Sequence, residues 1–482
     1  MSDATLIRKA DYVIAWDESA GGHCYLRDAD VVFDGNLFTF VGHDYTGDAA
    51  RTIDGGGLMV MPGFVNLHCH PHSEPGNKGV TEDAGSRQFG QSTLYEFLNI
   101  LNLDEAGAAA AARVAWSEML KSGVTTVADL SLPSEGWIDA LAATGLRGVL
   151  CPMVRSGGWY TSNGRTVEYA WNEQDGMQKF AWSLAIIDEA RKHPSGRLDG
   201  MVGPAQIDTC TEALLRDALA AARERGITLQ VHAAQSKVEF EEMTRRHRMT
   251  PIEFMHEIGL LGPDTIIGHG IFLNDHPWLH WPQGRDFEIL RDSGAAVAHC
   301  PTNFSRRGVA LNHLRRYLDA GIVVGLGTDT YPHNMINEIH IACIAARITS
   351  GEYTAGRTSH AFDAATLGGA AAMKRTDIGR IAKGAKADFS LVDLAHPYMR
   401  PLRDPLRSLV FSADDRAIRD VYVDGQCVVR DGEVLTIDVE AALDELAAAQ
   451  ARSLTTVPER DWAQRGIDDL SPMVYPQKGG LG

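Results

Sequence analysis

The sequence predicts an α/β protein: a (β/α)8 barrel of the TIM type with a small composite β-sandwich domain built from both chain ends. Three observations lead to this prediction. Apolar, β-branched runs alternate with helical stretches between residues 61 and 385. Most of these runs end in a polar residue, often a histidine. Short segments of alternating polarity stand at both ends of the chain, in residues 1–60 and 386–482. A doubly wound open sheet would show the same alternation and remains an alternative.

The first element is the amino-terminal half of the β domain. "LIRKADYVIAW" (6–16), "DADVVFDGNLFTFVG" (28–42) and "ARTIDGGGLMVM" (50–61) alternate in polarity and are separated by Gly, Asp and Asn turns. The same rhythm returns in "ADFSLVDL" (387–394) and in residues 415–434, before a polar, helix-prone tail. We therefore expect the two ends of the chain to form one domain beside a barrel of residues 61–385.

The barrel is predicted from eight strand-like runs, most of them followed by a helical stretch such as "TEALLRDALAAARERG" (211–226). The runs cover residues 63–70, 123–130, 146–154, 199–206, 227–233, 265–273, 295–301 and 322–329. In a barrel of this kind the chemistry lies at the carboxyl ends of the strands. The residues that end each run are therefore the first candidates for a functional site.

The amino-acid composition limits the classes of partner that the protein can bind. The net charge of −18 argues against nucleic acid and anionic membranes, and no apolar run reaches the length of a membrane span. Seven scattered cysteines without a CxxC pair indicate reduced thiols and no cysteine zinc site. We expect a cytoplasmic homodimer or homotetramer that acts on a small-molecule substrate.

Histidines and one aspartate stand at the predicted strand ends. His68 and His70 end the first run, and because alternate residues of a strand face the same side, both can bind one ion while Cys69 points away. His232 on the fifth run and Asp329 on the eighth would complete a divalent metal site with a position left for water. His269 and His299 end two further runs. The alternative, a set of unrelated core histidines, does not explain why so many strands end this way.

With these motifs the sequence resembles the amidohydrolase superfamily. The HxH after "MPGFVNLHCH", "VHA", "GHG", "HCPTN" and "GLGTD" are closest in order and spacing to its aminohydrolase branch, which includes triazine hydrolases and cytosine, guanine and S-adenosylhomocysteine deaminases. The resemblance implies a (β/α)8 barrel with a composite β-sandwich and one divalent ion, Zn(II) or Fe(II). It also implies that the ligands are His68, His70, His232 and Asp329, with His269 beside the water bound to the metal.

The expected chemistry is hydrolysis at an electron-poor carbon attached to nitrogen. A divalent ion lowers the pKa of bound water from about 15.7 toward about 7, which supplies a nucleophile at neutral pH. Asp329 can accept the proton of that water and pass it to the leaving nitrogen, and His269 can polarise the atom under attack.

Two departures from the branch pattern concern the substrate. Deaminases of the branch carry a glutamate three residues after the fifth-strand histidine, where this chain has Gln235, which cannot transfer a proton at neutral pH. Glu239, one turn later, is a possible substitute, although "EFEE" reads more readily as an exposed helix surface. Ala205 stands where purine-directed relatives have a histidine.

Other residues are predicted to line the substrate site because they lie in loops that follow predicted strands. They are His72, Glu74, Trp159, Tyr160, His299, His333 and Asn334. The sequence thus predicts a hydrolase of C–N bonds in a small nitrogen-containing, heterocyclic compound. An amide or cyclic-amide hydrolase is the first alternative, and a non-catalytic metal-binding scaffold is a remote one.

Overall fold

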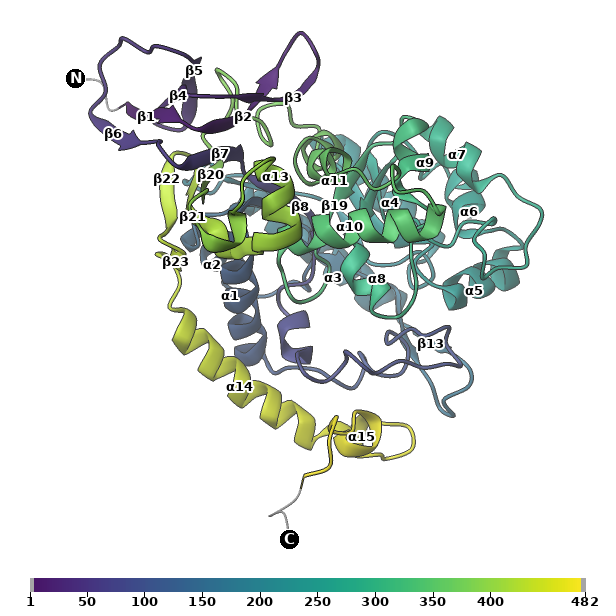
Figure 1. Cartoon of the computed structure of the whole chain (residues 1–482). Helices are drawn as coiled ribbons and strands as arrows, with labels where there is room; N and C mark the ends of the chain where they lie inside the picture. Colours follow the sequence, from purple (N-terminus) through teal and green to yellow (C-terminus); the bar gives the residue numbers. More distant parts are fainter. Residues whose placement is uncertain (1–3, 478–482) are drawn as a thin grey trace.

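The computed structural model describes residues 4–477 (Figure 1), so the outermost residues of the predicted β domain, 1–3 and 478–482, lie outside the described part. The chain is an α/β protein, as predicted. Every run expected to be a strand of the barrel contains one. In chain order these are β8 (Phe64–Cys69), β9 (Val124–Asp129), β10 (Arg147–Leu150), β11 (Met153–Val154), β14 (Leu198–Gly200), β15 (Gly203–Pro204), β16 (Leu229–Ala233), β17 (Thr265–His269), β18 (Ala296–His299) and β19 (Val324–Leu326).

These strands form parallel sheets whose carboxyl ends face the same side. One sheet has the order β14-β10-β9-β8, another has β16-β17-β18-β19, and β11 pairs with β15. Single parallel bridges join them, from Cys69 to Asp329 and from Gln206 to His232. Since parallel strands share one direction, the residues that end them are brought to a common edge.

Helices separate the strands, and α4 (Glu212–Arg225) shows how the sequence specifies them. Thr211 caps its amino terminus by accepting a hydrogen bond from the amide of Leu214. Gly226 ends the helix with φ of 63°, a left-handed conformation that glycine adopts at little cost. The other helices beside these strands are α1 (Glu105–Lys121), α2 (Trp137–Ala143), α3 (Glu173–Ala190), α5 (Lys237–His247), α6 (Pro251–Glu257), α7 (Asp286–Ser293), α8 (Pro301–Ser305), α9 (Leu314–Asp319), α10 (Met335–Ser350) and α11 (Thr358–Asp363).

The two chain ends share one sheet of seven strands, ordered β23-β22-β21-β20-β7-β2-β3. Its central contact pairs β7 (Leu58–Pro62) antiparallel with β20 (Phe389–Asp393), while β7 also runs parallel to β2 (Tyr12–Asp17). The remaining strands of this sheet are β3 (Gly22–Leu26), β21 (Ile418–Val423), β22 (Gln426–Arg430) and β23 (Glu433–Val434). β3 was not predicted, because "GHCYL" lies at the sheet edge and lacks a regular apolar alternation.

A second sheet, of order β5-β4-β1-β6, comes from the amino-terminal segment alone. Its strands are β1 (Thr5–Ala10), β4 (Ala29–Asp34), β5 (Leu37–Gly42) and β6 (Arg51–Asp54). Phe33 and Phe38 of this sheet pack against Phe389 of the seven-stranded sheet, with ring centroids 5.3 and 5.6 Å apart. The two sheets therefore share an apolar core.

A buried ion-pair network joins β10 to the seven-stranded sheet. Arg147, 2% exposed, donates to both carboxylate oxygens of Asp388 at 2.9 and 3.1 Å and to Asp424 at 2.8 Å. The fork of the guanidinium matches the carboxylate, so the pair also fixes an orientation. The network thus couples the amino end of β10 to the sheet formed by the chain ends.

The carboxyl-terminal tail forms α14 (Val439–Thr455), which packs along α1 (Figure 1). The side-chain amide of Gln450 donates to the carbonyls of Gly76 and Lys78, both at 2.8 Å. The tail thereby holds the loop that follows β8. None of the helices in residues 4–477 is both long enough and apolar enough to cross a membrane.

Candidate metal centre and active site

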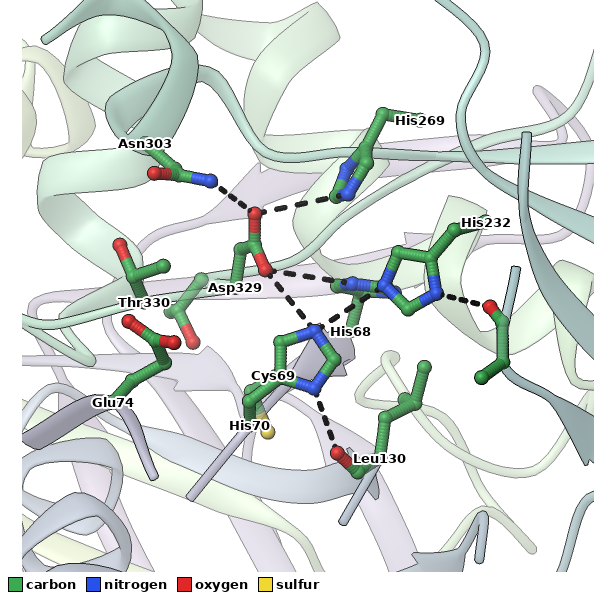
Figure 2. Close-up of polar contacts among 12 residues, drawn as sticks. His68, Cys69, His70, Glu74, Leu130, His232, His269, Asn303, Asp329 and Thr330 are labelled. Carbon is green, nitrogen blue, oxygen red and sulfur yellow. Dashed lines mark hydrogen bonds and ion pairs between the residues drawn. The ribbon is translucent and has the colours of Figure 1, made fainter. Parts of the chain in front are cut away.

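Four predicted ligands meet at the carboxyl edge of the parallel strands (Figure 2). The Nε2 atom of His70 lies 3.3 Å from Oδ1 of Asp329, and that of His68 lies 3.5 Å from the same oxygen. The Nε2 atoms of His70 and His232 are 3.3 Å apart. His68, His70 and His232 belong to one group whose ligand atoms all lie within 4.8 Å of one another. Strand pairing between distant parts of the chain creates this convergence.

The outer nitrogen of each imidazole is engaged by a carbonyl oxygen. Nδ1 of His70 contacts the carbonyl of Leu130 at 2.7 Å, and Nδ1 of His232 contacts that of Ala205 at 2.6 Å. Nδ1 of His68 contacts the side-chain oxygen of Gln230. Since carbonyl oxygens only accept, each Nδ1 carries a proton, and in the neutral ring each Nε2 has a free lone pair. Metal-binding histidines are oriented in this way.

This protonation pattern tests whether a cation fits the site. With both Nδ1 atoms protonated, the Nε2 atoms of His70 and His232 face each other at 3.3 Å with two lone pairs and no proton between them. Nε2 of His68 is buried and has no hydrogen-bond partner. Such an arrangement is repulsive unless a cation accepts the lone pairs, so the donor set fits a divalent metal ion.

Asp329 follows β19 and is held in an unusual backbone conformation. Its φ is +57°, which is uncommon outside glycine and costs free energy. Two backbone hydrogen bonds fix it, from its amide to the carbonyl of His68 at 2.8 Å and from the amide of His70 to its carbonyl at 3.1 Å. Gly327 makes this approach possible, because a Cβ there would lie 2.6 Å from Cβ of His68.

His269 lies on the other side of Asp329. Its Nε2 atom is 3.7 Å from Oδ2 of Asp329, and its ring packs against Phe304 with centroids 4.6 Å apart. Burial is the main cause that lowers the pKa of His269 to about 3, so its imidazole is neutral. Asn303 donates to the same carboxylate oxygen at 2.5 Å. His269 therefore has a neutral ring at the position expected for it.

Charges within the site are strongly perturbed. Burial alone would raise the pKa of Asp329, but the neighbouring His269, His68 and His70 hold that pKa well below its usual range. Burial lowers the pKa of His232 well below its ordinary value, and the neighbouring histidines add to this effect. Burial also lowers the pKa of His70, but Asp329 outweighs this effect, so the pKa of His70 is raised. Metal binding needs each imidazole in its neutral form beside the ionised carboxylate, so an incoming cation displaces any proton on the inner nitrogen of His70.

The structure corrects the expectation for Glu239. This residue is completely buried and not on an exposed helix surface. Its two carboxyl oxygens accept from the amides of Ala234 at 2.6 Å and Gln235 at 3.1 Å, so they are turned toward the backbone. Gln235 lines the cavity, and its Nε2 is buried without a hydrogen-bond partner. Glu239 thus supports the turn that carries Gln235 and does not take the place of a proton-transferring glutamate in the cavity.

A cavity of about 630 Å³ opens above the convergent ligands. Its walls come from the loop after β8, from α1 and α2, and from the segments that follow β16 and β18. The predicted residues that line it are His70, His72, Glu74, Trp159, His232, Gln235, His269 and Asp329. Burial raises the pKa of Glu74 to about 7. Small molecules are bound in cavities of this size.

His72 and Trp159 are fixed by aromatic and polar neighbours. The ring of His72 lies edge-on to Trp116 and Trp137, with centroids 5.9 and 5.2 Å away. Trp159 donates to the buried carboxylate of Asp208 at 2.7 Å. Trp159 lies in β12 (Gly157–Tyr160), which pairs with β13 (Glu168–Trp171), whereas the sequence suggested a loop here. These side chains give the cavity wall a defined shape.

Four other predicted substrate residues do not line the cavity. Tyr160 is 45% exposed, on the opposite face of β12 from Trp159. His299 is buried with its Nδ1 unpaired. His333 contacts the hydroxyl of Thr328 at 2.9 Å, and Asn334 caps the amino terminus of α10. Their positions after strand ends suggested the substrate site, but their side chains have other partners or turn elsewhere.

The sequence analysis did not single out Asn303, Arg155 or Arg307, which all line the cavity. Asn303 and Arg307 lie in "PTNFSRR", within nine residues of the histidine that ends β18. The signal in the sequence that could have identified them as cavity residues was their position shortly after a predicted strand end. Nothing in the local pattern distinguishes a residue that turns inward from one that does not, as neighbouring Arg306, stacked over Tyr331, shows.

Comparisons with known proteins agree with this geometry. The pattern of the amidohydrolase family matches residues 59–428. A 5-methylthioadenosine/S-adenosylhomocysteine deaminase of Halobacterium salinarum is 30% identical over 89% of this chain and 94% of its own length. A 5'-deoxyadenosine deaminase of Methanothermobacter thermautotrophicus is 29% identical over 90% of this chain and 96% of its own.

Solved structures show the same fold. An atrazine chlorohydrolase from Arthrobacter aurescens TC1, complexed with zinc, superposes with a TM-score of 0.76 at 23% identity over 92% of this chain and all of its own. An adenosine deaminase from Xanthomonas campestris with bound zinc superposes with a TM-score of 0.77 at 22% identity. The superposition covers 94% of this chain and 98% of that protein.

The fold and the site define a class, the metal-dependent hydrolases that act on carbon–nitrogen bonds. Within that class, the chain belongs to the amidohydrolase family. This confirms the resemblance predicted from the sequence.

Proposed function

We propose that His68, His70, His232 and Asp329 bind one divalent ion. Zinc is the preferred candidate and Fe(II) is the alternative. The facing lone pairs of His70 and His232, 3.3 Å apart, carry this proposal. Zinc is favoured because it is named for the chlorohydrolase and adenosine deaminase structures that share the fold. When bound, the ion supplies Lewis-acid activation of a water molecule.

The residues around this site have separate roles in the proposed reaction. Asp329 accepts the proton of the attacking water through one oxygen, while the amide of Asn303 holds the other at 2.5 Å. His269, neutral and packed on Phe304, polarises the substrate atom under attack. Gln235 offers an amide donor to a substrate acceptor, because its Nε2 has no protein partner.

The reaction supported best is hydrolysis of a carbon–nitrogen bond in a small nitrogen heterocycle, with release of ammonia or an amine. Relatives named as deaminases of adenosine derivatives cover most of this chain. One observation favours a second candidate, an amide or cyclic-amide hydrolase. The carboxylate expected for proton transfer to a ring nitrogen is replaced by Gln235, and both oxygens of Glu239 bind backbone amides.

A screen of zinc-reconstituted protein separates these candidates. Aminated triazines, pyrimidines and purines are assayed for ammonia release, and amides and cyclic amides for new carboxylate. We expect turnover in the first set, abolished by a chelator and restored by zinc. Turnover of amides alone would establish the second candidate. A protein that binds no stoichiometric divalent ion after reconstitution would be a non-catalytic scaffold instead.

We further propose that the parallel strands close into a (β/α)8 barrel of residues 61–385, and that residues 1–60 and 386–482 form one composite β-sandwich. Support comes from the single bridges between the parallel sheets and from the β7–β20 pairing. Native-state hydrogen exchange tests the composite domain: the amides of β7 and β20 should exchange through one common opening. Independent opening of the two strands would contradict a composite domain.

The proposed setting is a cytoplasmic homodimer or homotetramer without a nucleic-acid or membrane partner. All seven cysteines are free thiols, as in a reducing compartment. Met177 and Trp182, 42% and 43% exposed on α3, offer apolar surface to a second copy. Light scattering in solution tests the oligomeric state, and a monomer at micromolar concentration would contradict it.

A further inference from the structure

Two arginines of the cavity wall have no ion-pair partner. Three arginines line the cavity, and Arg113 is paired with Glu445. Arg155 makes no side-chain hydrogen bond or ion pair within residues 4–477. Arg307 donates through Nη2 to the hydroxyl of Thr93 at 2.9 Å, while its Nη1 is buried without a partner.

A lack of acidic residues does not explain these free charges. The chain has 63 acidic and 45 basic residues, so carboxylates are in excess. Arg225, which is partly buried elsewhere in the fold, pairs with Asp188 at 2.9 Å. Arg155 is exposed and can be solvated, whereas Nη1 of Arg307 is withdrawn from water without a counter-charge, which is unfavourable. Burial accordingly lowers the pKa of Arg307.

Arg307 faces the reacting end of the cavity. It follows α8, the helix that carries Asn303, whose amide donates to Asp329. The charges of Glu74 and Asp329 act on its guanidinium, although neither forms an ion pair with it. A group bound to the free Nη1 would therefore lie within the same cavity as the metal ligands.

We infer that Arg307 binds an anionic substituent of the substrate, and that this substituent is a carboxylate. This inference rests on the proposed function, because it adds a substrate class to that site. Guanidinium groups bind carboxylates and phosphates through charge-assisted hydrogen bonds. Only one terminal nitrogen of Arg307 is free, and two protein carboxylates lie nearby, so a single negative charge fits better than the two of a phosphate. Arg155 supplies a second cation on the same wall.

Binding of two probes that differ in one substituent tests the inference without requiring a reaction. The probes are 2-aminopyrimidine-5-carboxylate and its neutral analogue 2-amino-5-methylpyrimidine, titrated calorimetrically into zinc-reconstituted protein. We expect the carboxylate to bind about tenfold or more tightly than the methyl compound. In Arg307→Gln this preference should disappear, through weaker binding of the carboxylate and a change of less than about twofold for the methyl compound.

Arg306→Gln is the matched control, because it removes the same charge from the adjacent residue, which does not line the cavity. It should leave both affinities unchanged. Equal affinity of the two probes for the wild type, no binding of either, or equal losses in both variants would overturn the inference. Inorganic phosphate that binds more tightly than the carboxylated pyrimidine would overturn the choice of a carboxylate. Failure to turn over a bound probe would count against the proposed deamination alone.

Discussion

At the scale of single residues, the imidazoles of His70 and His232 set the chemistry of the site. Each neutral ring is held in one tautomer by a backbone carbonyl, at 2.7 and 2.6 Å, so its inner nitrogen carries the lone pair. Preorganisation of this kind lowers the cost of binding an ion, because no ligand has to turn or lose its orientation when the ion arrives.

His70→Ala tests the ligand set. The variant should lose most of its bound metal and nearly all activity, because one of three convergent Nε2 donors is removed. Metal content is measured by mass spectrometry after reconstitution, with circular dichroism to confirm folding. His72→Ala is the control, since His72 lies in the same loop but its ring packs on Trp116 and Trp137. Full metal content in His70→Ala would remove His70 from the ligands.

His269→Asn separates catalysis from metal retention. His269 lies 3.7 Å from Asp329 and shares a second group of possible ligands with His68, Cys300 and Asp329. The variant should keep its ion, because all four proposed ligands remain. Loss of a positioned polarising group should lower turnover by about 10² or more. Steady-state rates and metal content are measured on the same sample. Wild-type turnover would restrict His269 to a packing role against Phe304.

Gln235→Glu addresses proton transfer. The new carboxylate would lie beside the metal site and close to buried Glu239, so it would repel incoming negative charge. We expect turnover of the accepted substrate to fall by about tenfold or more. Gln235→Asn serves as a neutral control of similar chemistry. A clear gain in ammonia release by Gln235→Glu would contradict this prediction and show that the wild-type enzyme lacks an efficient proton carrier.

Some residues of the site could be predicted from the sequence, and others could not. His68 and His70 were accessible because alternate positions of a strand share a face, and Asp329 because it closes a strand-like run. The lack of an ion-pair partner for Arg307 within residues 4–477 could not be predicted from the sequence, since it depends on which carboxylates the fold places beside it. Glu239 was assigned to the surface because "EFEE" resembles a solvated helix face, whereas its carboxylate closes a turn before α5.

At the scale of secondary-structure elements, a buried carboxylate joins three segments on the outside of the parallel strands. Asp286, at the start of α7, accepts from the hydroxyl of Thr250 at 2.5 Å and from the amide of Asn274 at 2.7 Å. Thr250 itself caps α6. Burial raises the pKa of Asp286 to about 7, so its carboxyl is neutral in mildly acidic solution.

The raised pKa gives a pH-dependent contribution to stability. Between its ordinary pKa of 3.8 and about 7, the folded chain holds a proton on Asp286 that the unfolded chain releases. The contribution is therefore present below this range and is lost as the pH rises through 7. Asp286→Asn should remove it, raising the unfolding free energy relative to wild type by about 1 kcal/mol for each pH unit within that window.

Urea unfolding of wild type and Asp286→Asn at pH 5, 6 and 7 measures this difference. Asp292→Asn on the same helix is the control, because Asp292 is exposed and pairs with its neighbour Arg291. A difference between Asp286→Asn and wild type that stays constant with pH would contradict the predicted proton uptake.

Elements were predicted best where the apolar pattern is strong. Each parallel strand was found because it is buried on both faces and rich in branched residues. The β12–β13 hairpin was assigned to a loop because "SGGWYTSNGR" has turn-forming composition, and the tertiary contacts of Trp159 with Tyr95 and Asp208 override it. Edge strand β3 was missed because an edge position places weak demands on its sequence.

At the scale of the whole molecule, the Arg147–Asp388–Asp424 network ties the parallel strands to the seven-stranded sheet. Asp388→Ala leaves a buried guanidinium with one of its two carboxylates, which should lower the unfolding free energy by about 3–5 kcal/mol. Asp188→Ala is the control, because it breaks a similar two-pronged pair with Arg225 in which Asp188 is exposed and Arg225 only partly buried. That variant should lose no more than about 1 kcal/mol. Equal losses in denaturant titrations would show that the network does not couple the two parts.

The β7–β20 pairing has a consequence for biosynthesis. β7 leaves the ribosome with only β2 as a neighbour, and its other edge receives β20 about 330 residues later, on the order of half a minute at ordinary elongation rates. Throughout that interval the nascent chain presents an unpaired, fully apolar strand, the kind of edge that recruits other chains. We therefore expect chaperones that cover exposed apolar strands to raise the yield of soluble protein in an expression host.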